Sequence, residues 1–190
     1  MDINFLLRSL TLALLIIWRV YWSIHKKEAA IKKPKTDNNQ RIIEQIFANL
    51  AAGYIVISLL GFVIFPLSNL NVQIIGFILT ILGFVEGIIA RKTLDTNWTN
   101  SNEYQIKKDH ELITKGIYGY VRHPIYGGML LMIPGVLMVA GSYTFIAGLI
   151  VMIIVFELFA RREEKLLTKY FGKKYIEYMK MTKKFIPFIY

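Results

Sequence analysis

The chain has 190 residues, of which 55% are hydrophobic, and 23 lysines and arginines against 13 acidic residues give a formal net charge of +10. This composition excludes a disordered chain, a collagen-like chain and a small secreted domain held by disulfides. The chain contains no cysteine, which excludes a thiolate nucleophile, an iron–sulfur cluster, a CxxC zinc site and a lipidated cysteine. Because a mean hydropathy of +0.44 is too high for a soluble domain of this length, we expect an all-α integral membrane protein.

Residues 4–24 form the first predicted membrane span, since about 20 mostly apolar residues cross a bilayer. Arg8 and Arg19 lie near its two ends, where long side chains reach the lipid headgroups. The apolar part is longer than that of a signal peptide and no small-x-small cleavage motif closes it, so we expect this span to be retained. Residues 25–46 are predicted to form a cytoplasmic linker.

Two further spans, 47–67 and 72–90, are predicted on either side of the uncharged sequence PLSNLN. The proline and the asparagines of this sequence favour a tight turn, which predicts a helical hairpin. Residues 1–90 are therefore expected to form an N-terminal membrane region of three helices.

The last two spans, 125–140 and 143–160, are predicted to form a second hairpin that turns at Gly141 and Ser142. The first arm contains Pro134 and covers roughly 24 Å at 1.5 Å per residue, which is short for a full crossing. Beyond residue 160, apolar residues recur at helical spacing, which predicts an amphipathic helix or helix pair broken near Gly172. We expect the final FIPFIY sequence to dock on protein or lipid.

Basic residues concentrate in alternate connecting regions, which predicts the orientation of the chain. Of the 23 lysines and arginines, 21 lie in residues 25–46, 91–124 and 161–190. The positive-inside rule makes these regions cytoplasmic, so about five transmembrane helices place the N-terminus outside and the C-terminus inside. Membrane lipid is the partner that such flanking charges favour. We expect no binding of nucleic acid, because the basic residues flank spans instead of lining one soluble face.

Two carboxylates, Glu86 and Glu157, fall inside the predicted spans. An ionisable group inside a span is energetically unfavourable, so it usually faces a bundle interior or a cavity. A position of this kind is typical of functional sites. A structural role is the stronger alternative for Glu86, because Gly83 and Gly87 form a helix-packing pair around it and its carboxyl group can bond a neighbouring helix.

The densest polar and glycine-rich stretch is 109–128, which reads DHELITKGIYGYVRHPIYGG and leads directly into a predicted span. Glycines let backbone amides approach a ligand closely, and Pro124 fixes the turn after Arg122 and His123. Such a basic, aromatic segment at the membrane face suits a polar cofactor with anionic and aromatic parts. A turn that contacts lipid headgroups explains the same residue types equally well.

A second polar cluster, at residues 161–164, follows the last predicted span and reads RREE. Helical surface pairs and membrane anchoring explain much of it. A glutamate there can also hold the ammonium group of a ligand while an arginine holds a carboxylate, as an amino-acid moiety requires. We expect no metal site, because the chain has only three histidines, no HExxH motif and no cysteine.

Two motifs that occur in order around the second hairpin carry a resemblance to a known family. The first is H-x-L-x-x-x-G-x-Y-x-x-x-R-H-P-x-Y-x-G over residues 110–128, and the second is EExxLxxxFGxxYxxY over residues 163–178, followed by a late FIP. On these residues the C-terminal half of the chain resembles the isoprenylcysteine carboxyl methyltransferase family.

The resemblance implies an integral membrane methyltransferase that uses S-adenosylmethionine without a Rossmann domain, and the chain has no GxGxxG motif. Residues 91–190 would then form the catalytic half, with a cytoplasmic cofactor pocket in which Glu163 holds the amino-acid end of the cofactor. The residues expected at the cofactor are His110, Glu111, Leu112, Ile113, Tyr118, Arg122, His123, Pro124, Ile125, Tyr126, Glu163 and Glu164.

The acceptor implied by the resemblance is a lipophilic or lipid-linked substrate, such as the carboxylate of an isoprenylcysteine. The protein must align donor and acceptor and exclude water, and a carboxylate acceptor needs no general base. The substrate-contacting arginine of the family lies about a turn before the two glutamates, where this chain has Phe159. We therefore expect Arg161 or Arg162 to orient the acceptor as the catalytic residue.

Two alternatives remain open. Membrane sterol and steroid reductases, which use NADPH, share an RHPxY-type turn and a late IPxIY, and this chain ends in IPFIY. Against a reductase, Ile125 stands where that pattern has asparagine, and the chain has fewer predicted spans than sterol reductases. A non-catalytic membrane scaffold is the other alternative, and it predicts that Arg122, His123 and Glu163 are dispensable for every ligand.

Overall fold

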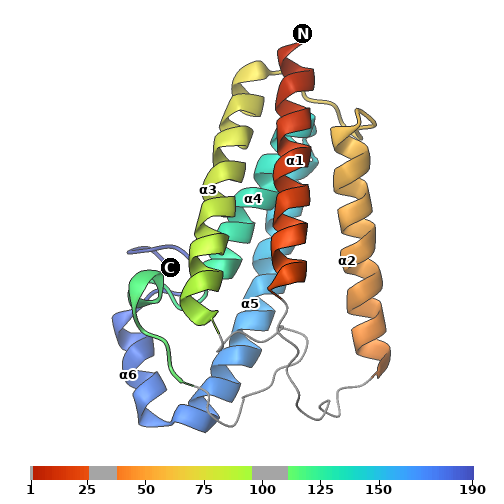
Figure 1. The fold of residues 1–190 in the computed structure, drawn as a ribbon. Coiled ribbons are helices and arrows are strands. Elements are labelled where there is room, and N and C mark those ends of the chain that lie inside the picture. Colours follow the sequence, from red (N-terminus) through yellow and green to blue (C-terminus); the bar gives the residue numbers. More distant parts are fainter. Residues whose placement is uncertain (1, 26–37, 96–110) are drawn as a thin grey trace.

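A computed structural model describes residues 2–25, 38–95 and 111–190, and within them it is a bundle of helices. The elements in chain order are α1 (Ile3–Ile24), α2 (Asn38–Leu59), α3 (Leu70–Leu94), the 3-10 helix η2 (Gly116–Gly119), α4 (Pro124–Ala140), α5 (Thr144–Phe171) and α6 (Lys173–Met181). Helices α1 to α5 lie lengthwise beside one another, and α6, η2 and the C-terminus lie at the end opposite the N-terminus (Figure 1). The predicted all-α fold is confirmed for this part of the chain.

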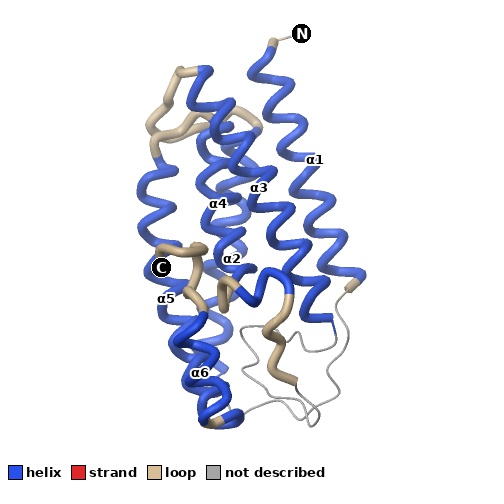
Figure 2. The backbone as a smooth tube through the Cα atoms, turned by 90° about the vertical axis from the view of Figure 1, so that its left-hand side faces the viewer, coloured by secondary structure: helices blue, strands red, loops and turns tan. Residues whose placement is uncertain are grey.

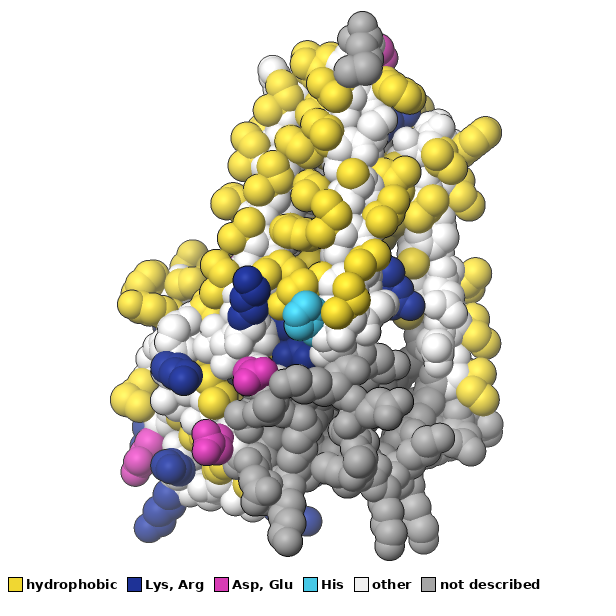
Figure 3. All heavy atoms as spheres, in the orientation of Figure 1, with side chains coloured by type: hydrophobic (Ala, Val, Ile, Leu, Met, Phe, Trp, Pro, Cys, Tyr) yellow, Lys and Arg dark blue, Asp and Glu magenta, His cyan; other side chains and the backbone are white. Residues whose placement is uncertain are grey.

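Among the residues that the structure describes, three helices, α1, α3 and α5, are long and apolar enough to cross a membrane. The other apolar helices, α4 and the segment Gln45–Leu59 of α2, are shorter. Apolar side chains cover the surface of the long helices, and charged side chains gather toward the end that carries α6 (Figure 3). The five predicted spans thus correspond to five apolar helices, three of which have the length of a complete crossing.

The second predicted span, 47–67, is wrong at its C-terminal end, since the apolar segment of α2 is Gln45–Leu59. Helix α2 begins at Asn38, inside the predicted linker 25–46, and ends at Leu59. Gly61 has a φ of +104°, which ends the helical path before the predicted turn at Pro66. Residues 60–69 instead form an irregular connection, whose Leu67 N–H donates to the carbonyl oxygen of Gly141 at 2.7 Å. Residues 26–37 of the predicted linker lie outside the described residues.

Small residues let α3 and α4 pack closely. A Cβ atom on Gly83 of α3 would overlap the carbonyl oxygen of Gly128 in α4, and one on Gly135 of α4 would lie 2.6 Å from the carbonyl oxygen of Gly76. Gly87, the other member of the predicted pair, packs against α1. The predicted packing role of these glycines is confirmed. Helix α4 is consequently the central helix, placed between α3 and α5 (Figure 2).

Helix α5 continues past the predicted end of its span at residue 160 and reaches Phe171 without interruption. Gly172, with a φ of +58°, then separates α5 from α6 at the predicted break. Beyond α6 the chain returns to the start of α4, where Phe185 is buried against Tyr126 and Phe156. The predicted docking of the FIPFIY tail on protein is therefore confirmed at its first residue.

Candidate functional site

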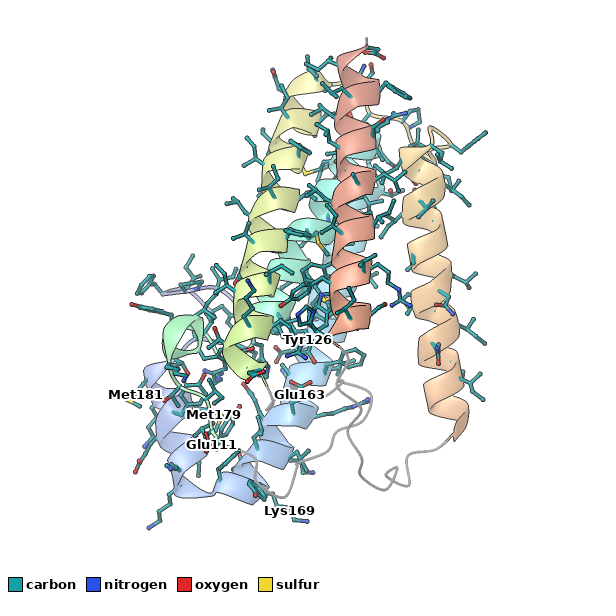
Figure 4. All side chains as sticks on the ribbon, in the orientation of Figure 1. Glu111, Tyr126, Glu163, Lys169, Met179 and Met181 are labelled. Atoms are coloured by element: carbon teal, nitrogen blue, oxygen red, sulfur yellow. The ribbon has the colours of Figure 1, made fainter. Side chains whose placement is uncertain are left out.

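The two polar motifs meet at the start of α4. Pro124 is the first residue of α4, so Arg122 and His123 directly precede the helix and face Glu163 and Glu164 on α5. Figure 4 shows Glu163 beside Tyr126, near the lower end of the bundle. The fold thus brings together groups that are about 40 residues apart in the chain.

Arg122 connects three elements. Its Nε donates a hydrogen bond to Oε1 of Glu164 at 2.8 Å, and its Nη1 donates to the carbonyl oxygens of Thr182 at 2.5 Å and Met179 at 3.3 Å. The backbone N–H of Arg122 donates to the carbonyl oxygen of Lys183 at 2.8 Å. A planar guanidinium can form the three side-chain bonds at once. Arg122 therefore ties the start of α4 to α5 and to the C-terminal segment.

His123 is buried between two carboxylates. Its Nδ1 lies 3.4 Å from Oε2 of Glu163, and its Nε2 lies 3.3 Å from Oε1 of Glu164. Burial opposes a charge on the imidazole, but hydrogen bonds and charges from the two glutamates outweigh burial and raise the pKa of His123. The site therefore favours the imidazolium, which donates from both ring nitrogens.

Glu164 is the anion that these cations share. Burial alone would raise the pKa of this carboxyl group, but contacts with His123 and Arg122 lower it to about 2. The ammonium group of Lys184 lies 3.7 Å from the second oxygen of Glu164. Glu164 is thus ionised at neutral pH and fully engaged with side chains of the protein.

Glu163 is held by fewer groups and is more accessible. The hydroxyl of Tyr126 donates to its Oε1 at 2.5 Å, and His123 faces its Oε2. Stacking of Tyr126 on Phe156, with ring centroids 4.9 Å apart, fixes the direction of that hydroxyl. The side chain of Glu163 is 26% exposed against 14% for Glu164. An oriented and accessible carboxylate of this kind can accept hydrogen bonds from the ammonium group of a ligand.

The other residues expected at the cofactor surround this cluster more loosely. Tyr118 is buried in η2, where its carbonyl oxygen accepts a hydrogen bond from the hydroxyl of Tyr178 at 2.7 Å. Glu111 is exposed and lies apart from Tyr126 in Figure 4. Leu112, Ile113 and Ile125 are half-buried, Pro124 is buried, and His110 lies outside the described residues.

Arg161 and Arg162 are exposed, next to the second carboxylate predicted inside a span. Nε of Arg161 donates to Oε1 of Glu157 at 2.6 Å, although the Arg161 side chain is 70% exposed. Glu157 also pairs with Lys184 at 2.9 Å and accepts a hydrogen bond from the Tyr190 hydroxyl at 3.3 Å. Glu157 therefore anchors the C-terminal segment beside α5. A carboxylate inside a span can have a structural or a functional role, and these contacts are structural.

The C-terminal segment contributes to the site mainly through its backbone. The N–H groups of Arg122 and His123 donate to the carbonyl oxygens of Lys183 and Lys184, and the N–H of Lys183 donates to the carbonyl oxygen of Tyr120. Backbone hydrogen bonds leave no residue signature, so the late FIP motif was the one sequence signal that pointed to this segment. Lys184, which bridges Glu157 and Glu164, carried no signal of its own.

Comparisons with known proteins agree with this arrangement. The family described as phospholipid methyltransferase matches residues 72–174, which is more than half of the chain. Protein-S-isoprenylcysteine O-methyltransferase of Schizosaccharomyces pombe is 39% identical over 85 residues, which cover 43% of this chain and 35% of that protein. Protein-S-isoprenylcysteine O-methyltransferase B of Arabidopsis thaliana is 31% identical over 118 residues, covering 60% of this chain and 58% of that protein. The chain spans about half the length of the curated relatives it matches.

The fold is shared with a solved structure of a eukaryotic intramembrane Ras methyltransferase, an isoprenylcysteine carboxyl methyltransferase. The two structures agree with a TM-score of 0.68 at 21% sequence identity, over 98% of this chain and 68% of the other. The resemblance noted from the two motifs is thus confirmed by sequence relatives and by the fold. The chain belongs to the phospholipid methyltransferase family, and isoprenylcysteine methyltransferases are among its relatives.

Proposed function

We propose that this protein is an integral membrane methyltransferase that transfers a methyl group from S-adenosylmethionine to a lipophilic or lipid-linked acceptor. The observation that carries the proposal is the accessible carboxylate of Glu163, oriented by Tyr126 and His123 at the end of the apolar helices. Family membership supports the type of reaction. The relatives named as isoprenylcysteine O-methyltransferases support a lipid-linked carboxylate as the acceptor.

The residues of the cluster suit the amino-acid end of S-adenosylmethionine. Glu163 would accept hydrogen bonds from the ammonium group of the cofactor, while Tyr126 and His123 hold both of its oxygens in place. Arg122 and His123 neutralise Glu164, which keeps a second negative charge from competing for that ammonium group. When bound, S-adenosylmethionine supplies a methyl group that its sulfonium charge has already activated.

The position of the cluster suits an acceptor with a lipid tail. Charged side chains begin where the apolar surface of the helices ends (Figure 3), so an acceptor tail can remain in the bilayer while its head reaches the cluster. We place this end in the cytoplasm by the positive-inside rule, with the N-terminus outside. Arg161 and Arg162 lie at the same end, and we propose that they orient an acceptor carboxylate. Unchanged turnover after charge reversal at both arginines would contradict that role.

Calorimetric titration of the detergent-purified protein with S-adenosylmethionine, and separately with NADPH, tests the proposal. We expect saturable binding of S-adenosylmethionine that Glu163→Ala and His123→Ala both weaken by at least about 10-fold, the loss of one charge-assisted hydrogen bond. Glu177→Ala, which removes an exposed carboxylate on α6, is the matched control and should bind as the wild type does. Binding of NADPH alone would favour a reductase, and binding of neither ligand would favour a scaffold.

A further inference from the structure

A patch of exposed apolar side chains lies at the C-terminus, outside the proposed cofactor site. We call it the C-terminal patch, and its members are Tyr120, Ile186, Phe188, Ile189 and Tyr190. Phe188 is 81% exposed, and its ring lies 6.1 Å from that of Tyr120, measured between centroids. An exposed apolar patch of this kind marks a contact with lipid or with another protein.

The backbone of residues 185–190 closes on itself in a turn. The N–H groups of Phe185 and Ile186 both donate to the carbonyl oxygen of Tyr190 at 2.8 Å. The N–H groups of Ile189 and Tyr190 donate to the carbonyl oxygen of Ile186 at 3.3 and 3.2 Å, respectively. A segment next to lipid must satisfy its backbone polar groups without water, and this turn satisfies four of its N–H groups within itself.

Phe188 has a backbone conformation that bulky residues rarely adopt. Its φ of +66° lies in the left-handed region, where Cβ crowds the backbone. In water, the exposure of its ring would add a second unfavourable contribution. An apolar environment around the ring offsets both of these contributions, which favours a lipid contact for the turn.

The turn lies beside the apolar helices and not beyond their ends. A Cβ atom on Gly127 would lie 2.7 Å from the carbonyl oxygen of Phe185 and 3.1 Å from Oε1 of Glu86, so the turn starts level with Glu86. Helix α3 continues from Glu86 to Leu94, which corresponds to about 12 Å of helix. The C-terminus accordingly lies above the lower ends of α1 and α3 in two views (Figures 1 and 2). The patch is therefore at the depth where the membrane helices approach the headgroups.

Lysines flank the C-terminal patch, and no acidic residue accompanies them. Residues 178–190 contain three lysines and no aspartate or glutamate, and two of the lysines, Lys180 and Lys183, are exposed. In Figure 3, apolar side chains protrude beside the lower part of the bundle, above the charged side chains of the α6 end. Exposed aromatic rings beside lysines are typical of segments at the boundary between lipid headgroups and acyl chains.

We infer that the C-terminal patch lies in the membrane leaflet at the α6 end of the bundle, at the boundary between headgroups and acyl chains. Its rings and apolar side chains contact lipid, and Lys180 and Lys183 contact headgroup phosphates. A second protein is the alternative occupant, and the depth of the turn and the unopposed lysines favour lipid. The bilayer then holds the segment that completes the site, because the carbonyl oxygens of Lys183 and Lys184 accept hydrogen bonds from the N–H groups of Arg122 and His123.

Spin labels on the protein in vesicles of phosphatidylcholine and phosphatidylglycerol test this inference. Because the chain contains no cysteine, Phe188→Cys and Ile189→Cys each carry a single label. Ile89→Cys, at an exposed position of α3, is the lipid-facing reference, and Glu177→Cys, at an exposed position of α6, is the water-facing reference. We expect both patch labels to collide with dissolved oxygen as the Ile89 label does. Their collision rate with a water-soluble nickel chelate should be several-fold lower than that of the Glu177 label.

Footprinting of the wild type gives the same test without a substitution. A diazirine reagent dissolved in the acyl chains should label residues 185–190, which trypsin releases by cleavage after Lys184, and should leave residues 175–180 of α6 unlabelled. The inference is overturned if residues 185–190 stay unlabelled, or if the patch labels meet the chelate as freely as the Glu177 label does. Shielding of both patch labels from oxygen and from the chelate would also overturn it, because a protein partner would then cover the patch.

Discussion

The two ends of α4 each contact an arginine, but the arginines bind different groups. At the end of α4, Nη2 of Arg8 donates to the carbonyl oxygen of Ala140 at 2.7 Å, so the cation caps a helix C-terminus. At the start of α4, Arg122 and His123 place positive charge at a helix N-terminus and are paired with Glu164. The helix dipole favours a cation at the first of these ends and opposes one at the second.

This difference gives the end of α4 a role in stability and the start of α4 a role in function. The contact of Arg8 with Ala140 satisfies a carbonyl oxygen at the end of the helix and so stabilises the bundle. The opposite end holds a guanidinium, an imidazole and two carboxylates; the helix dipole opposes the two cations there, and burial opposes the charges of His123 and Glu164. Folding alone does not require such an arrangement, and one of its carboxylates, that of Glu163, remains accessible.

The largest effect is expected from Arg122→Leu, which removes the main cation from a carboxylate that is only 14% exposed. Breaking a buried ion pair on one side costs about 3–5 kcal/mol of unfolding free energy, and the carbonyl contacts at the end of α6 are lost with it. Thermal unfolding in detergent measures this loss. Arg161→Leu removes an arginine that is 70% exposed and should leave the stability close to that of the wild type. Equal unfolding free energies of Arg122→Leu and Arg161→Leu would contradict the buried ion pair that distinguishes the start of α4 from its end.

Arg8→Leu should lower the unfolding free energy by about 1–3 kcal/mol, because the carbonyl oxygen of Ala140 loses its charged donor. Its affinity for S-adenosylmethionine should equal that of the wild type, since the contact lies at the far end of α4. Thermal unfolding and calorimetry on the same preparation measure both quantities. A loss of affinity as large as that of Glu163→Ala would mean that the two ends are coupled.

Stability should also depend on the protonation of His123. Its pKa is higher in the folded state than in the unfolded chain, because Glu163 and Glu164 outweigh the effect of burial. The stabilisation from its charge is then fully present below the unfolded pKa of about 6.5 and is lost as the pH rises through the higher folded value. The unfolding temperature of the wild type should therefore fall as the pH rises above about 6.5, and His123→Gln should lack that decrease. Parallel curves for the two proteins would contradict the assignment of the imidazolium.

The smallest effect is expected from Tyr126→Phe, which removes the hydroxyl that orients Glu163 but keeps the ring stacked on Phe156. We expect a loss of about 3-fold to 10-fold in affinity for S-adenosylmethionine, below that of Glu163→Ala, because one hydrogen bond is lost and the carboxylate remains. Calorimetry measures it, with Tyr120→Phe as the control on an exposed tyrosine. A loss equal to that of Glu163→Ala would give Tyr126 a direct contact with the ligand.

Much of the fold was predictable because blocks of apolar residues mark membrane helices and glycine marks their breaks. The sequence predicted the apolar helices α1, α3, α4 and α5, of which α1, α3 and α5 are long enough to cross a membrane, and the break at Gly172. It predicted α2 wrongly, because the polar residues that begin this helix resemble a linker and because Gly61 ends the helical path before Pro66 does. Short-range turn signals cannot tell which of two neighbouring breakers the fold uses.

The members of the site were predictable from motifs, but their contacts were not. The RHP and EE motifs identified the residues that meet at the start of α4. Arg122 and Lys184 pair with Glu164 while His123 is shared and Glu163 stays more accessible. This division depends on how α5 is rotated about its axis, which the sequence pattern does not specify. The contact of Arg8 with Ala140 joins residues 132 positions apart, and no local pattern predicts a contact at that separation.

Ultraviolet cross-linking of S-adenosylmethionine, labelled in its methyl group, to the protein in native membranes tests the central claim most directly. Peptide mapping should place the label within residues 111–126 or 157–164, and Glu163→Ala should prevent labelling while Arg8→Leu should not. Labelling confined to residues 1–95, or labelling that persists unchanged in Glu163→Ala, would contradict the claim that the start of α4 binds the methyl donor.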